Sequence, residues 1–131
     1  MAAMGQPANY ECFDAAEVRF DAGESKVAQV ELRKLRQLAC RWEARGVSQL
    51  MLVGHASKNE PNPGPLAELR AVRVKLALAD LGVPLDRIYA EGKANLQPVV
   101  EPRSPLNQRV EIVYFCSAGP KSVPVPDACR P

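Results

Sequence analysis

Aromatic residues, strong net charge and long apolar runs are all scarce in this chain. Only 5% of its 131 residues are aromatic and the net charge is +2, which leaves few stacking platforms and only a weak field for attracting nucleic acid. No run approaches the roughly 20 apolar residues that span a bilayer. The first residues, MAAMGQPANYECF, lack the basic start and apolar core of a signal peptide. The sequence therefore predicts neither a nucleic-acid partner nor a membrane-spanning segment.

Metal and cofactor motifs are missing as well. The chain has a single histidine, His55, and its four cysteines form no CxxC pair, so a zinc site is not predicted. Gly92-Lys93-Ala94 lacks the Gly-Lys-Ser/Thr that completes a phosphate loop. We therefore expect no metal and no cofactor.

The cysteines are few and widely spread, at Cys12, Cys40, Cys116 and Cys129. They are either buried free thiols or two disulfides made in an oxidising compartment, and the even count favours disulfides. Three pairings are open. The expected one joins Cys12 to Cys40 and Cys116 to Cys129, because the second bridge would fix the Pro-rich tail.

What is present fits one folded domain, since 47% of the residues are hydrophobic. Strands are predicted at residues 18–20, 50–53, 87–90 and 109–115, and helices at 25–45 and 65–81. This β-α-β-α-β-β order predicts the α/β class, in the form of an α+β two-layer sandwich. Two helices are expected on one face of a four-stranded mixed sheet. Residues 1–16 are expected to form an N-terminal extension, 17–116 the domain, and 117–131 a Pro-rich tail.

The segment 50–71 carries the candidate site. An apolar strand ends in a Gly-His turn, a loop rich in proline and asparagine follows, and a helix then begins. Ligands of such sheets collect at the carboxyl ends of strands, beside helix N-termini. Arg70 is expected to face outward there and to hold a carboxylate. The apolar stripe of the helix is expected at Leu66, Leu69, Val72 and Leu76, widened by Ala71, Val74 and Leu78.

Five short motifs follow one another in the order typical of one family. They are Gly54-His55-Ala56-Ser57, Leu66-Ala67-Glu68-Leu69-Arg70-Ala71 preceded by Asn62, Gly82-Val83, Gly92 to Pro98, and Asn107-Gln108-Arg109-Val110-Glu111-Ile112. Over residues 18–115 the chain resembles an OmpA-like C-terminal domain, the peptidoglycan-binding module of OmpA, peptidoglycan-associated lipoprotein and flagellar stator proteins. Because some of its motif residues differ from the family pattern, the chain resembles a divergent member of this family.

The resemblance implies a binding role for the turn and the second helix. In the family, a turn aspartate holds the ammonium of diaminopimelate in the wall peptide, and a helix arginine holds its carboxylate. Arg70 matches the arginine, whereas Ser57 stands in place of the aspartate and Ala56 in place of the preceding threonine. Ser57 can still accept one neutral hydrogen bond, which is worth about 1 kcal/mol, against roughly 1.5–3 kcal/mol for a charge-assisted one. Glu60 or Glu68 is a candidate to replace the missing charge.

The predicted ligand contacts share the rim of this cleft: Arg70, Ser57, His55, Ala56, Asn62, Leu66, Asn107 and Arg109. Some of these have a plainer structural interpretation. Arg109 is as well explained by pairing with Glu111 or Glu91, and Asn107 by capping a turn. His55 is better explained as a satisfied structural histidine than as a general base, because no nucleophile motif surrounds it.

The leading hypothesis is a non-catalytic peptidoglycan-binding module of the cell envelope. The alternative is a degenerate OmpA-like domain that has lost wall binding and acts as a protein-protein interaction scaffold in the periplasm. A hydrolase built on His55 ranks third, so no enzyme is predicted. The implied partners are the diaminopimelate stem peptide and other envelope proteins. The implied location is the periplasm, with an outer- or inner-membrane anchor upstream of this chain.

Overall fold

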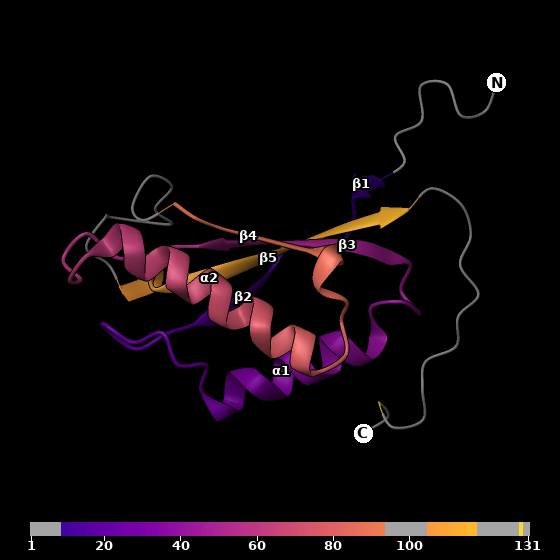
Figure 1. Ribbon diagram of the computed structural model, residues 1–131, viewed down its shortest axis with the longest axis horizontal. Coiled ribbons are helices and arrows are strands. Elements are labelled where there is room, and N and C mark those ends of the chain that lie inside the picture. The colour runs from indigo at the N-terminus through magenta and orange to yellow at the C-terminus, as the bar shows by residue number, and fades with distance from the viewer. Residues whose placement is uncertain (1–8, 94–104, 118–128, 130–131) are drawn as a thin grey trace.

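The computed structural model describes residues 9–93, 105–117 and 129. Within these residues, one sheet contains β1 (Asn9–Glu11), β2 (Ala16–Arg19), β3 (Val47–Gly54), β4 (Ile88–Gly92) and β5 (Arg109–Ser117). Two helices, α1 (Gln29–Arg41) and α2 (Pro63–Asp80), lie on one side of the sheet (Figure 1). Two 3-10 turns, η1 (Leu85–Arg87) and η2 (Pro105–Asn107), come before β4 and β5. The predicted two-layer fold is confirmed.

The sheet is mixed, and its strands run in the order β1-β5-β3-β4, with β2 also paired to β5. The β3–β4 pair is parallel, as expected of strands joined through a helix. All other pairs are antiparallel. The described residues thus hold five strands rather than the predicted four. The strand that the sequence missed is β1, because a strand of three residues is too short to show an alternating pattern.

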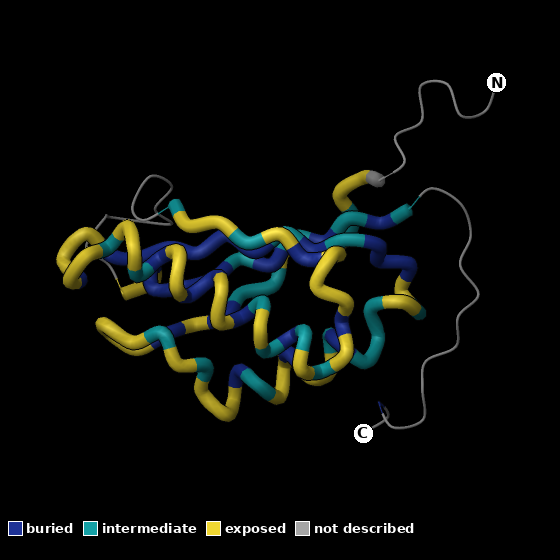
Figure 2. The backbone as a smooth tube through the Cα atoms, viewed as in Figure 1, coloured by how far each residue is buried: buried dark blue, intermediate teal, exposed yellow. Residues whose placement is uncertain are grey.

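The core lies between the sheet and the helices, where Figure 2 shows the buried stretches of β3 and β5. Alternation along β5 buries Val110, Ile112, Tyr114 and Cys116, since successive strand residues face opposite sides. From the helical layer, α1 adds Leu35 and Ala39, and from the sheet, β3 adds Leu50 and Leu52. Neither helix is long and apolar enough to cross a membrane, as far as the described residues extend.

The buried face of α2 differs from the predicted apolar stripe. The helix buries Ala67, Arg70, Ala71, Val74 and Leu78. Leu69, Val72 and Leu76 are 41%, 38% and 49% exposed, so the prediction that they face the core is wrong. Two glycines explain the choice of face. A Cβ on Gly54 would lie 1.9 Å from the carbonyl oxygen of Ala67, and one on Gly92 would lie 2.4 Å from the backbone nitrogen of Glu68. The helix backbone therefore approaches the strands too closely for large side chains between them.

Two disulfides join distant parts of the chain, as predicted, but the expected pairing is wrong. Cys12 bonds to Cys116, and Cys40 bonds to Cys129. The first pairing follows from β1, because Tyr10 lies opposite Cys116 in the β1–β5 register and brings Cys12 to the same strand. The second fixes residue 129 to α1. The unpredicted strand therefore also decided the disulfide pairing.

Candidate functional site

The candidate site lies where β3 ends, beside the start of β5 and the first turns of α2. Of the eight predicted residues, six come together here and are buried: His55, Ala56, Ser57, Arg70, Asn107 and Arg109. The other two lie at the start of α2: Asn62 is the residue just before the helix, and its carbonyl accepts the backbone N–H of Leu66 in the first turn. Asn62 is exposed and Leu66 half-buried. The structure thus gathers most of the predicted set without placing all of it in one contact network.

Arg70 is fully buried, so the expectation that it faces outward is wrong. Its Nε donates to the carbonyl of Glu24 at 2.8 Å. Nη1 donates to the carbonyl of His55 at 3.1 Å and to Oε1 of Glu60 at 2.8 Å. Nη2 donates to the carbonyl of Asp21 at 3.2 Å and to Oε2 of Glu60. A guanidinium has five N–H donors, and these five bonds use all of them.

Glu60 is the partner that makes this burial tolerable. Besides the bidentate pair with Arg70, Oε1 accepts the backbone N–H of Ser57 at 2.7 Å and Oε2 accepts that of Gly23 at 2.8 Å. Burial alone would raise the pKa of the Glu60 carboxyl. The hydrogen bonds from Arg70, Gly23 and Ser57 outweigh burial and hold that pKa below its ordinary 4.5. The carboxyl is therefore ionised at neutral pH.

Four donors thus converge on one carboxylate: two from Arg70 and one each from the backbones of Ser57 and Gly23. We call these donors the carboxylate site. Charge-assisted, bidentate bonds of this kind are the strong ones. Gly23 has a φ of +74°, a backbone conformation that glycine adopts without strain, and that conformation positions its N–H. Arg70 and Glu60 together hold the loop before α1 against the loop before α2.

Sequence reasoning named Glu60 only as one of two candidate acids. The other, Glu68, is exposed on α2. Sequence reasoning missed Gly23 and the carbonyls of Asp21 and Glu24 altogether, because a backbone group carries no residue-type signal. It also missed Gln108, which is buried and donates through Nε2 to the hydroxyl of Ser57 at 3.3 Å. The only available signal was the spacing of Glu60, three residues after Ser57.

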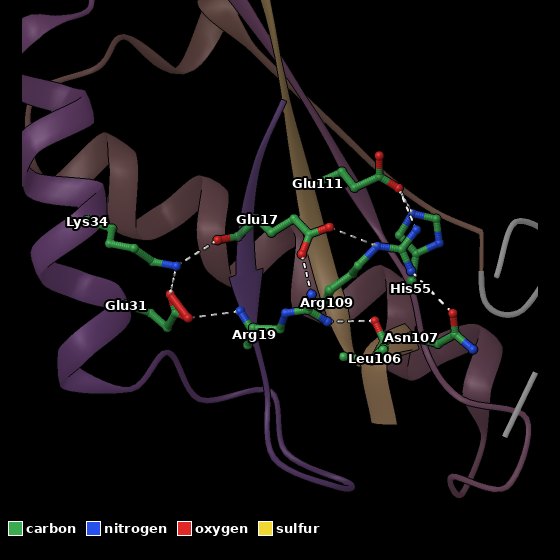
Figure 3. A network of polar contacts seen from close by, with 9 residues as sticks. All are labelled: Glu17, Arg19, Glu31, Lys34, His55, Leu106, Asn107, Arg109 and Glu111. Carbon is green, nitrogen blue, oxygen red and sulfur yellow. Dashed lines mark hydrogen bonds and ion pairs between the residues drawn. The ribbon is translucent and has the colours of Figure 1, made fainter. Parts of the chain in front are cut away.

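A second polar cluster adjoins the first and includes the only histidine (Figure 3). Nε2 of His55 lies 2.7 Å from Oε1 of Glu111, and Nη2 of Arg109 lies 2.7 Å from the same oxygen. Arg109 also approaches Asn107 Oδ1 at 3.4 Å and Glu17 Oε1 at 3.8 Å. Of the two acids considered for Arg109, Glu111 is therefore the one found.

The imidazole of His55 is fully enclosed. Burial lowers its pKa below the ordinary 6.5, and the positive charge of Arg109 lowers it further against the opposing effect of Glu111. The ring is therefore neutral at pH 7. Its backbone is also in use, since the N–H donates to the carbonyl of Arg109 at 2.8 Å. These contacts favour the structural interpretation of His55 over a general base, which needs access to a substrate.

Across residues 9–93 and 105–117, no group of three or more histidine, cysteine or acidic side chains is arranged to hold an ion. In the structure, the fixed donors of the carboxylate site hold the protein's own carboxylate, that of Glu60.

The chain is similar to one curated protein and to several solved structures. No protein-family model matches it. It is 31% identical over 103 residues to the Outer membrane protein A of Bordetella avium. This match covers 74% of the chain and 53% of that relative, so the chain spans about half the length of the curated protein.

Several solved structures have the same fold. The OmpA-like domain of FopA1 from Francisella tularensis superposes with a TM-score of 0.71 at 16% identity, over 83% of this chain and 80% of that one. The peptidoglycan-associated lipoprotein of Burkholderia pseudomallei gives 0.67 at 24% identity, over 75% and 88%. The cell wall anchor of the T6SS from Pseudomonas aeruginosa gives 0.65 at 24% identity, over 84% and 89%.

Proposed function

Because the chain belongs to the family of OmpA-like C-terminal domains, we propose that it is a non-catalytic module that binds peptidoglycan in the bacterial cell envelope. Two proteins of the same fold support this by their names, one a peptidoglycan-associated lipoprotein and the other a cell wall anchor. The two disulfides fit an oxidising compartment. The proposed location is accordingly the periplasm, on a parent protein anchored to the outer or inner membrane.

The observation that carries the proposal is the carboxylate site itself. Arg70 and the N–H groups of Ser57 and Gly23 already hold a carboxylate, that of Glu60. A wall peptide ends its diaminopimelate side chain in a carboxylate and an ammonium on one carbon. In the proposed complex, the carboxylate of the peptide takes the place of Glu60 on Arg70. The displaced Glu60 then pairs with the ammonium and supplies the negative charge that Ser57 lacks.

This exchange requires a local movement. Arg70 is closed in by the carbonyls of Asp21 and Glu24 on one side and by Glu60 on the other. The loop before α1 and the loop before α2 must therefore separate before a peptide can enter. The hydrogen bond from Gly23 to Glu60 is one of the links that must break.

The same geometry favours a second function if Glu60 is never displaced. An arginine with all five donors satisfied inside the protein has none left for a ligand, and the domain would then be a periplasmic scaffold. The exposed apolar side chains Leu69, Val72 and Leu76 on the outer face of α2 favour this second function, since apolar patches of that kind often mark protein-protein contacts.

Sedimentation with purified sacculi that contain diaminopimelate separates the two functions. We expect the protein to sediment with the sacculi, and free meso-diaminopimelate to release it. Arg70→Ala should remain in the supernatant, whereas Arg73→Ala should sediment like the wild type, because Arg73 is an exposed arginine on the same helix. Circular dichroism of each variant shows whether it has folded.

Two outcomes contradict the proposal. Wild-type protein that stays in the supernatant would favour the scaffold. Protein that sediments but resists diaminopimelate would show that the wall is bound elsewhere than at Arg70. Because the competition uses the unaltered protein, it decides the question even if Arg70→Ala does not fold.

A further inference from the structure

A groove separate from the carboxylate site runs along the side of α1. It is open to solvent and has a volume of about 460 Å³, which is within the range of small-molecule sites. One wall is formed by α1 and the segment after it, and the other by a residue of β5. We call it the α1 groove, and its lining residues are Arg33, Lys34, Gln37, Leu38, Arg41, Arg45 and Tyr114.

Positive charge dominates the α1 groove, since four of its seven lining residues are cations. Lys34 is neutralised, because its Nζ lies 2.6 Å from Oε2 of Glu31 and donates to the carbonyl of Glu17 at 3.0 Å (Figure 3). The three arginines have no acidic partner in the part of the chain that the structure describes. Unpaired like charges repel one another, so an anion bound between them would relieve that repulsion.

Two of these arginines are held in place by neutral groups. The guanidinium of Arg45 lies 4.1 Å from the ring centre of Phe13 and 5.8 Å from that of Tyr114. Stacking uses the flat face of a guanidinium and leaves the N–H groups at its edge available. Arg41 donates through Nη2 to the carbonyl of Cys129 at 3.4 Å, while its buried Nε has no hydrogen-bond partner among the described residues. A buried donor without a partner is uncommon, and a bound anion is one group that would satisfy it.

We propose that the α1 groove binds a phosphate ester. Three guanidinium groups offer more donors than the two oxygens of a carboxylate can accept, whereas a phosphate presents three or four oxygens and pairs with arginine in the same forked manner. Leu38 and Tyr114 supply an apolar wall for the carbon part of the ester. The phosphate belongs either to a soluble ester or to the headgroup of an anionic lipid, and the chemistry of the groove is the same for both.

A binding experiment with two probes tests the proposal and tells these sources apart. Inorganic pyrophosphate is titrated while the fluorescence of Trp42 is followed, since this is the only tryptophan and it follows Arg41 directly. In parallel, the protein is sedimented with phosphatidylcholine vesicles that either contain or lack phosphatidylglycerol. Binding of pyrophosphate supports a soluble ester, and sedimentation only with phosphatidylglycerol supports a lipid headgroup.

Paired variants show whether the groove or the overall charge is responsible. The double variant Arg33→Gln/Arg45→Gln should weaken binding about tenfold or more, because each lost arginine removes a charge-assisted bond. The control Arg73→Gln/Arg87→Gln removes the same charge from exposed positions on α2 and η1 and should leave the affinity unchanged. The proposal is overturned if neither probe binds, or if both double variants weaken binding equally. Neither result depends on whether the protein binds peptidoglycan.

Discussion

Glu60→Ala is the substitution that tests the carboxylate site most directly. It leaves the Arg70 guanidinium buried without its counter-charge and leaves the N–H groups of Ser57 and Gly23 without an acceptor. Removing one partner of a buried ion pair costs about 3–5 kcal/mol. No large discount for solvent screening applies, since Glu60 is only 6% exposed. For a domain of this size the melting temperature should fall by roughly 10–20 °C.

Acetate should reverse much of this loss. Alanine keeps the Cβ of Glu60, and the two carbons of acetate correspond to the Cγ and Cδ that were removed. An added acetate can therefore occupy the space and accept the same four hydrogen bonds. Stabilisation by a ligand of the folded state grows with its concentration and reaches about 2.7 kcal/mol when the ligand is at about 100 times its Kd.

The assay is thermal unfolding of wild type and variant in rising acetate, against chloride at equal ionic strength. Glu68→Ala is the matched control, because Glu68 is an exposed glutamate on α2. It should change stability by no more than about 0.5 kcal/mol and should not respond to acetate. The reasoning is refuted if Glu60→Ala is as stable as the control, or if acetate stabilises it no more than chloride does.

Acid titration gives a second measurement on the same pair. The pKa of Glu60 in the folded protein is below its ordinary 4.5, so the unfolded chain takes up the proton first as the pH falls. The stability that Glu60 contributes is therefore fully present above about pH 4.5 and is lost as the pH falls through the lower, folded pKa. The difference in stability between wild type and Glu60→Ala should shrink over that interval. A difference that does not change with pH would contradict the ionised pair.

Two further predictions concern the surroundings of the site. Gly54→Ala should destabilise the fold by about 1–3 kcal/mol or more, because its Cβ would meet the Ala67 carbonyl. Chemical denaturation measures this loss of stability. The control Gly64→Ala should be tolerated, because its Cβ meets no atom within 4 Å. The pKa of His55 should lie below 6.5 in the folded protein, so the stability that depends on its neutral form should fall as the pH drops below 6.5. Because it is the only histidine, it gives a single imidazole signal that NMR can follow against pH. A titration midpoint at or above 6.5 would contradict its burial beside Arg109.

Much of the fold was predictable because its signals are local. The alternation in β5 and the continuous apolar run in β3 identify strands without tertiary information. Gly82, which has a φ of +108°, ends α2 at the predicted place. The order of the five motifs was a further signal, and it identified the family even where single residues differ from the family pattern.

The buried face of α2 could not be predicted, because it depends on partners far away in the sequence. A helical pattern assigns Leu69, Val72 and Leu76 to the core and an arginine to solvent. Arg70 reverses this assignment because the loops at residues 21–24 and 55–60 supply acceptors for every one of its donors. Without those acceptors a buried guanidinium would cost several kcal/mol, and nothing in the helix itself reveals that they exist.

The same contacts change how the departure from the family pattern at Ser57 is understood. Taken alone, serine in place of aspartate is the loss of a charge. In the structure, the acid is present three residues later, and the backbone N–H of Ser57 binds it. The site therefore still contains one negative and one positive group, but the negative group, Glu60, is hydrogen-bonded to Arg70 itself. A ligand carboxylate can bind only the fraction of molecules in which Glu60 has left, and its apparent affinity falls by that fraction. Under the proposed function, serine at position 57 therefore does not remove the binding of a carboxylate. It changes how strongly an external carboxylate must compete with Glu60 for Arg70.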